Sequence, residues 1–330
     1  MIKTFRTIST IIFTLLAINS IAKAEVKVVA SIKPIHSLVS YVMDGVGKPD
    51  IIVDGYNSPH NFNLKPSHAK MIEKANLIIW VGEDLETFLE KPLKSISKEA
   101  VNVEIMDLKG IKKLKFREKN IFEGHDDHGH GNKEHKEHGH DEHKEHGHKE
   151  KKHDDHGHEG HAHGDHDPHV WLDPMNAKVI VEEIENQLVK LDPGNASKYK
   201  ANSKKAQSEL DNLTRNIKKD LKKDLRFVVF HDAYQYFENR FGIKVLGALT
   251  VNPDVLPGAE QLSEIREVIE HEKVNCLFSE PQFNPAIIKS IAKDTKVKTG
   301  VLDPLGATID KGKGMYTQLL SNMYSSFKGC

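Results

Sequence analysis

The sequence is poor in cysteine, nearly neutral in charge and almost free of long apolar runs. Its 330 residues include two cysteines, and the formal net charge is −1 at pH 7. No basic stripe accompanies this balance, so the composition argues against nucleic-acid binding. A single apolar run, at 8–21, is shorter than the roughly 20 residues that a transmembrane helix needs, and no later segment approaches that length. We therefore expect no stable membrane insertion.

The apolar run has the organisation of a secretory signal peptide. Lys3 and Arg6 precede it, and Ala22-Lys23-Ala24 follows with the small-x-small pattern of a cleavage site. A membrane anchor is the alternative, but the run is short and a polar strand follows it. We expect residues 1–24 to be removed and the mature chain to be exported. Because this segment contains no cysteine, lipid attachment is excluded and free diffusion in a periplasm is favoured.

The two cysteines, Cys276 and Cys330, suit an exported protein. In an oxidising compartment, a pair of cysteines is typical of one disulfide bond. Such a bond would attach the C-terminus to an internal strand. Ligation of zinc by the two thiolates is the alternative.

Short apolar segments alternate with helical patterns along most of the mature chain. Alternation of this kind predicts mostly parallel sheets that are covered on both faces. We therefore expect an α/β fold with two lobes, one at 25–194 and the other at 224–330, joined by one long polar helix at 195–223. Clefts between such lobes are common ligand sites. The predicted strands lie at 26–31, 51–55, 77–82, 101–106, 226–231, 244–250, 275–280 and 298–303.

A histidine-rich insertion interrupts the first lobe at 124–167. It repeats EHKEHGH and DDHGH and contains almost no apolar residue, so it cannot offset the entropy of ordering and is expected to be disordered. Its mobile imidazoles should form several weak metal sites at high local concentration. A solvated linker that chelates metal without specificity is the alternative. Of the 21 histidines in the chain, the insertion holds His125, His128, His130, His135, His138, His140, His143, His146, His148, His153, His156, His158, His161, His163 and His166.

Three of the remaining six histidines stand where ligands gather in α/β proteins. His60 follows the second predicted strand, and His231 ends the strand RFVVFH, so both lie at carboxyl ends of strands. His169 lies where the first lobe resumes after the insertion. Each could be a structural histidine, but three at such positions favour a metal site. The other three, His36, His68 and His271, lie inside predicted helices and are interpreted as structural or solvated.

Three neutral imidazoles suit zinc, copper or nickel rather than magnesium or calcium. Zinc prefers four ligands, so one position remains to be filled. The candidates are Glu280, Asp303 and water, since both carboxylates end predicted strands of the second lobe. Water or Asp303 is favoured.

Long motifs resemble a known family. They are SIKPIHSLV, SPHNFNLKPSHAK, ANLIIWVGEDLETFL, DPHVWLDP, FVVFHDAYQYF, VNPDVLPG, SEPQFNPAII and LDPLGA. They are similar to the ZnuA family, periplasmic zinc-binding components of zinc ABC importers in the metal-specific class of solute-binding proteins. The resemblance covers nearly the whole mature chain. It implies two lobes joined by one long helix, with the metal in the cleft between them.

The resemblance also assigns residues. The three histidine ligands of the family fall on His60, His169 and His231. Manganese-selective relatives tend to have a carboxylate where His231 stands, which supports zinc. Some zinc members have an acidic residue before the first ligand, but Pro59 stands there in this chain. The family's aspartate at the last strand end matches Asp303, which need not reach the metal in zinc members. Its C-terminal disulfide matches Cys276 and Cys330.

We therefore expect a monomeric binding protein that carries Zn²⁺ to an inner-membrane ABC permease with a cytoplasmic ATPase. A zinc hydrolase is one alternative, although no HExxH motif is present and no general base stands beside a ligand in the sequence. A surface adhesin or zinc store is another. The folded two-lobe pattern and the missing lipid-attachment cysteine argue against it.

Overall fold

The computed structural model describes residues 25–122, 164–221, 225–253 and 255–330. The predicted signal peptide at 1–24 lies outside the described residues. So does most of the histidine-rich insertion, including all of its histidines except His166.

The first lobe is built on a four-stranded parallel sheet with the order β2-β1-β3-β4. The two central strands, with the sequences VVASI and LIIW, are buried along their whole length, as expected for a parallel sheet that is covered on both faces. Its elements are β1 (Val28–Ile32), α1 (Lys33–Val42), β2 (Asp50–Val53), α2 (Pro66–Glu73), β3 (Leu77–Trp80), α3 (Thr87–Ser95) and β4 (Val101–Glu104).

The second lobe repeats this arrangement, with the strand order β6-β5-β7-β8 and parallel pairing between all four strands. The predicted class, two α/β lobes with parallel sheets, is therefore confirmed. The elements of this lobe are β5 (Arg226–His231), α6 (Gln235–Phe241), β6 (Lys244–Thr250), α7 (Ala259–His271), β7 (Cys276–Ser279), α8 (Ala286–Thr295) and β8 (Lys298–Val301).

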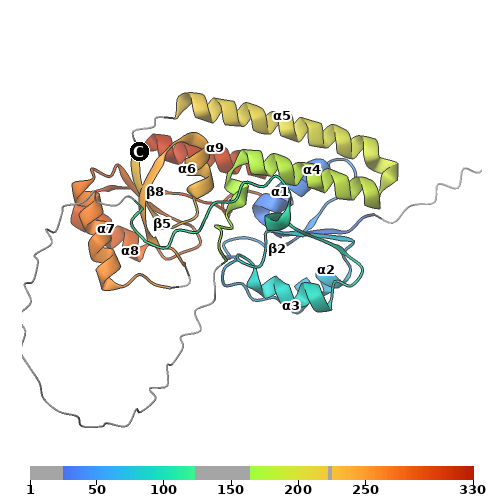
Figure 1. Cartoon of the computed structure of the whole chain (residues 1–330), viewed down its shortest axis with the longest axis horizontal. Helices are drawn as coiled ribbons and strands as arrows, with labels where there is room; N and C mark the ends of the chain where they lie inside the picture. The colour runs from blue at the N-terminus through green and yellow to red at the C-terminus, as the bar shows by residue number, and fades with distance from the viewer. Residues whose placement is uncertain (1–24, 123–163, 222–224, 254) are drawn as a thin grey trace, which may run out of the picture.

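Three helices run along one side of the two lobes: α4 (Pro174–Leu191), α5 (Ala196–Asp220) and α9 (Met315–Gly329) (Figure 1). The helix α5 corresponds to the predicted long helix, and it packs against α4, α1 and α9. Its contacts explain its composition, because Tyr199, Leu210 and Ile217 form a buried stripe on an otherwise polar helix. None of the helices in the described part of the chain combines the length and apolarity needed to cross a bilayer.

Buried polar contacts tie the lobes together beside the cleft. Lys33, at the start of α1, donates from Nζ to the carbonyl oxygens of Ala307 (3.2 Å) and Ile309 (2.6 Å) of the second lobe. Trp171 donates from Nε1 to the carbonyl oxygen of Pro304 at 2.8 Å. These bonds cross between segments that are far apart in sequence and link the two sides of the cleft.

The segment that precedes the insertion leaves the first lobe and pairs with the edge strand of the second. The amide of Phe122 donates to Leu246 O at 2.9 Å, and the amide of Ala248 donates to Asn120 O at 2.8 Å. Glycine is needed opposite this segment, because a Cβ at Gly247 would lie 2.7 Å from the Asn120 carbonyl oxygen. Residues 120–122 thus belong to the second sheet, although the sequence places them within the first lobe.

The far end of the insertion is also part of the fold. The amide of Phe116 donates to Asp165 O at 3.2 Å, and the amide of Asp167 donates to Leu114 O at 2.9 Å. Lys115 and His166 form the antiparallel bridge between these bonds. The predicted boundary of the disordered insertion at 167 is therefore wrong, since 165–167 pair with 114–116.

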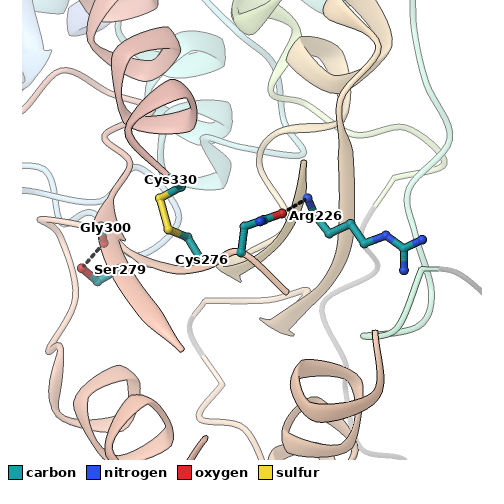
Figure 2. The surroundings of a disulfide bond; sticks show 6 residues. Arg226, Cys276, Ser279, Gly300 and Cys330 are labelled. Carbon is teal, nitrogen blue, oxygen red and sulfur yellow. Dashed lines mark hydrogen bonds between the residues drawn. A yellow bond between two sulfur atoms is a disulfide. The ribbon is translucent and has the colours of Figure 1, made fainter. Parts of the chain in front are cut away.

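The predicted disulfide is confirmed. Cys276, the first residue of β7, is bonded to Cys330 after α9, with the two Cα atoms 5.9 Å apart. Figure 2 shows this bond beside β7 and β8, where Ser279 Oγ donates to Gly300 O at 3.2 Å. Because no cysteine is free, the alternative of zinc ligation by thiolates does not hold.

Candidate metal centre

Three histidines from separate elements meet between the lobes. His60 lies in the loop after β2, His169 lies directly before a short 3₁₀ helix (Val170–Leu172), and His231 is the last residue of β5. Their ring centroids are 5.5 Å apart for His60 and His169, 5.6 Å for His60 and His231, and 5.2 Å for His169 and His231. His169 and His231 are each 3% exposed, whereas His60 is half-buried.

The ring nitrogens of these histidines have the spacing of a metal site. One ring nitrogen from each can be chosen so that all lie within 4.8 Å of one another, and in the described residues no other set of three or more histidine, cysteine or acidic side chains does this. His169 Nε2 and His231 Nε2 are 3.3 Å apart. Two nitrogens bound to one tetrahedral zinc, each at about 2.0–2.1 Å, are separated by about 3.3–3.4 Å. The observed spacing therefore fits a shared ion.

Asp167 sets the orientation of His169. Its Oδ1 lies 2.7 Å from His169 Nδ1 and also accepts the backbone N–H of His169 at 2.9 Å. A carboxylate only accepts, so Nδ1 carries the proton and the lone pair is on Nε2, which faces His231. Burial lowers the pKa of His169 well below the usual value for histidine, which keeps the ring in the neutral state that binds metal.

Glu280 does the same for His231. Its two oxygens lie 2.7 and 2.9 Å from His231 Nδ1, and Tyr234 donates its hydroxyl to Oε1 at 2.9 Å. Burial alone would lower the pKa of His231, but the nearby carboxylates, Glu280 first among them, outweigh it and raise the pKa. In both pairs a buried carboxylate fixes which ring nitrogen faces the space between the three histidines.

The space between the histidines is small. The cavity has a volume of about 10 Å³, which is room for one ion or one water rather than for an organic molecule. Apolar side chains form much of its wall, including Pro59, Trp171, Phe283 and Leu305. An apolar wall around charged or polar ligands strengthens their interaction with a cation, because it lowers the local dielectric constant.

The two predicted carboxylate candidates have different positions. Glu280 lines the cavity, but its oxygens are occupied by His231 and Tyr234. Asp303 does not line the cavity. Its Oδ1 accepts from Gln282 Nε2 at 3.0 Å, and its Oδ2 accepts from the amide and the hydroxyl of Thr308, each at 3.1 Å.

The other three histidines serve local structure or solvent contacts. His36 Nε2 lies 3.2 Å from Pro49 O, and His68 Nδ1 accepts the amide of Lys65 at the start of α2. His271 ends α7 on the surface. Asp167 was not predicted as a site residue, because it lies at the end of the acidic, histidine-rich insertion, two residues before His169.

Comparison with known proteins places this geometry in a class. A crystal structure of ZnuA has a TM-score of 0.71 and 20% identity, over 92% of this chain and 98% of that one. The two chains thus share the same two-lobed fold. Residues 28–330 match the family described as ZnuA, zinc-uptake complex component A, periplasmic.

Sequence relatives agree with that match. The high-affinity zinc uptake system protein ZnuA of Brucella abortus is 49% identical over 314 residues, which cover 94% of this chain and 93% of the relative. The protein of the same description from Haemophilus influenzae is 39% identical over 337 residues, covering 98% and 97% of the two chains. The chain belongs to the ZnuA family. It is therefore a binding component of zinc uptake and not an enzyme.

Proposed function

We propose that this chain binds one Zn²⁺ between its lobes through His60, His169 and His231 and delivers it in the periplasm to the permease of an ABC importer. The observation that carries the proposal is the 3.3 Å separation of two buried Nε2 atoms whose Nδ1 atoms are both committed to carboxylates. Two neutral nitrogen atoms whose lone pairs face each other at that distance repel each other unless a proton or a cation lies between them.

A water molecule is proposed as the fourth ligand. Asp303 already accepts three hydrogen bonds from Gln282 and Thr308, and the residue directly before His60 is Pro59, which has no carboxylate. A site with three nitrogens and one exchangeable oxygen holds zinc firmly and still leaves one position through which the ion can be passed on.

The hydrolase alternative has little support in the geometry. Among the described residues, Glu280 is the one carboxylate in the wall of the cavity, and it is engaged by His231 and Tyr234 rather than available as a general base. The cavity of about 10 Å³ also leaves no room for an organic substrate.

Growth under zinc limitation tests the proposal. A bacterial strain that lacks its own periplasmic zinc-binding component but retains the permease should grow in chelator when this chain is supplied. A variant with His60, His169 and His231 all replaced by alanine should fail to restore growth while reaching the same periplasmic level. Equal growth with both proteins would refute the proposed role of the three histidines.

A further inference from the structure

Asp303 lies next to the cleft but is held away from it. It is followed directly by Pro304, which lines the cavity, whereas Asp303 itself does not. Three donors hold the carboxylate: Gln282 Nε2 on Oδ1, and the amide and hydroxyl of Thr308 on Oδ2. Thr308 is local to the loop of Asp303, whereas Gln282 comes from the segment that joins β7 to α8.

Gln282 is the one of these partners that also lines the cavity. A carboxylate can only accept hydrogen bonds, so the NH₂ end of the Gln282 amide must point to Asp303. The other end of the amide, Oε1, is buried and has no hydrogen-bond partner among the described residues. The side chain of Gln282 thus donates to Asp303 through Nε2. Its Oε1 atom can accept a hydrogen bond from a further partner, such as a water bound to a metal in the cleft.

The metal preference of the cleft depends on whether Asp303 reaches the ion. Three imidazoles and a neutral oxygen suit zinc, whereas an added carboxylate oxygen favours harder ions such as Mn²⁺. We infer that Gln282 is a positioning residue that withholds Asp303 from the metal and thereby favours zinc over Mn²⁺. This inference rests on the proposed zinc site at the three histidines.

The test compares metal selectivity in a double-mutant cycle. Dissociation constants for Zn²⁺ and for Mn²⁺ are measured in the wild type, Gln282→Leu, Asp303→Asn and the double variant. Without Gln282, the Oδ1 atom of Asp303 loses its donor and should join the metal, while Oδ2 keeps its two bonds to Thr308. Because Mn²⁺ then binds more tightly, the ratio of the Mn²⁺ dissociation constant to the Zn²⁺ dissociation constant should fall by at least about tenfold. Residues that hydrogen-bond to metal ligands change metal affinity on this scale. The double variant should regain the wild-type ratio.

Two further readouts separate positioning from general damage. With Co²⁺ in the cleft, the strong visible absorption of a four-coordinate ion should weaken in Gln282→Leu as the coordination number rises, and return in the double variant. Gln282→Met repeats the comparison with a side chain of similar length, in case leucine disturbs folding. Gln318→Leu, on the exposed face of α9, is the matched control for loss of an amide.

Three results would overturn the inference. They are an unchanged ratio in both Gln282 variants, a lowered ratio that persists without the carboxylate of Asp303, and a ratio that falls only because zinc binds more weakly. Failure of the underlying site is recognised separately. In that case tight zinc binding by the wild type would not depend on the three histidines, whatever the Gln282 variants do.

Discussion

At the scale of single residues, the carboxylates behind the histidines organise the site. Asp167 and Glu280 each lie 2.7 Å from an Nδ1 atom, and both side chains are buried. They fix the tautomer and the ring orientation before any ion arrives, so less ordering is needed on binding. His60 is more exposed than the other two histidines and comes from a loop of the first lobe.

Removal of the charge on Glu280 should therefore weaken zinc binding. Glu280→Gln keeps the size of the side chain but makes a weaker acceptor for His231 Nδ1, and we expect zinc affinity to fall by about 10- to 100-fold. Competition titration against a chelator of known affinity measures this change. Glu260→Gln, an exposed acid on α7, is the matched control. Affinity equal to wild type in Glu280→Gln would remove Glu280 from the organisation of the site.

The affinity should also depend on pH. Zinc binds neutral imidazole, whose reference pKa is about 6.5, so protons compete increasingly as pH falls. The carboxylate of Glu280 raises the pKa of His231. Protons therefore begin to compete with zinc for this ring at a pH above the usual pKa of histidine. The dissociation constant should rise steadily from pH 7.5 to pH 5. A constant value over this range, measured with the same competition titration, would indicate that carboxylates rather than histidines hold the metal.

Sequence patterns identified the three histidines but not their partners. His60 and His231 were recognisable because they follow apolar strands, and the carboxyl ends of such strands meet at the cleft. Asp167 could not be separated from the insertion by composition, because the decisive feature is pairing with 114–116, which is remote in sequence. Glu280 was recognisable as a residue at a strand end, but its role depends on the direction of its side chain toward His231.

At the scale of elements, the strands were predicted more closely than the helix ends. All eight strands appear within a few residues of their predicted positions. Strands of a parallel sheet are buried on both faces, so they are recognisable in the sequence as continuous apolar runs. The sequence pattern favours a helix over 83–91, but α3 begins only at Thr87. The reason is Glu86, whose Oε2 accepts the amides of Val81 (2.7 Å) and Gly82 (3.3 Å) and so closes a turn before the helix. A turn that is closed by a side chain in this way produces no periodic pattern of apolar residues in the sequence.

The disulfide links two elements and should affect stability without affecting zinc. Cys276 and Cys330 are 54 residues apart, and closing a loop of that length contributes on the order of 4 kcal/mol in the chain-entropy model. Urea unfolding of the zinc-free protein should show a lower free energy of unfolding for Cys276→Ser/Cys330→Ser by a value up to that size. Equal unfolding curves would show that the bond contributes nothing to stability.

Zinc affinity is the control for the disulfide prediction. Cys276 pairs with Phe227 in the parallel register of β5 and β7, whereas His231 lies four residues further along β5. At about 3.3 Å per residue, this places the bond about 13 Å from the site along the strands. The double serine variant should therefore bind zinc as the wild type does.

At the scale of the whole molecule, the chain contains two populations of histidines. The residues of 124–163 are almost without apolar side chains, so this segment cannot hold ligands in one geometry by packing and should provide several weak sites. The three histidines between the lobes instead belong to the folded part of the chain: His231 ends β5, and His60 and His169 lie in segments near the contacts that join the lobes. Because 165–167 pair with 114–116 and lead into His169, a deletion that tests the insertion must stop at 163.

Calorimetric titration of zinc into the mature protein lacking 124–163 tests whether His60, His169 and His231 form the tight site. We expect one tight site per chain in the deletion variant, with fewer zinc ions bound in total than by the full chain. Single replacement of His60, His169 or His231 by alanine should weaken this site by at least about tenfold, since the ion loses one of its strong ligands. Tight binding that survives replacement of all three histidines, or that disappears with the deletion alone, would contradict the account.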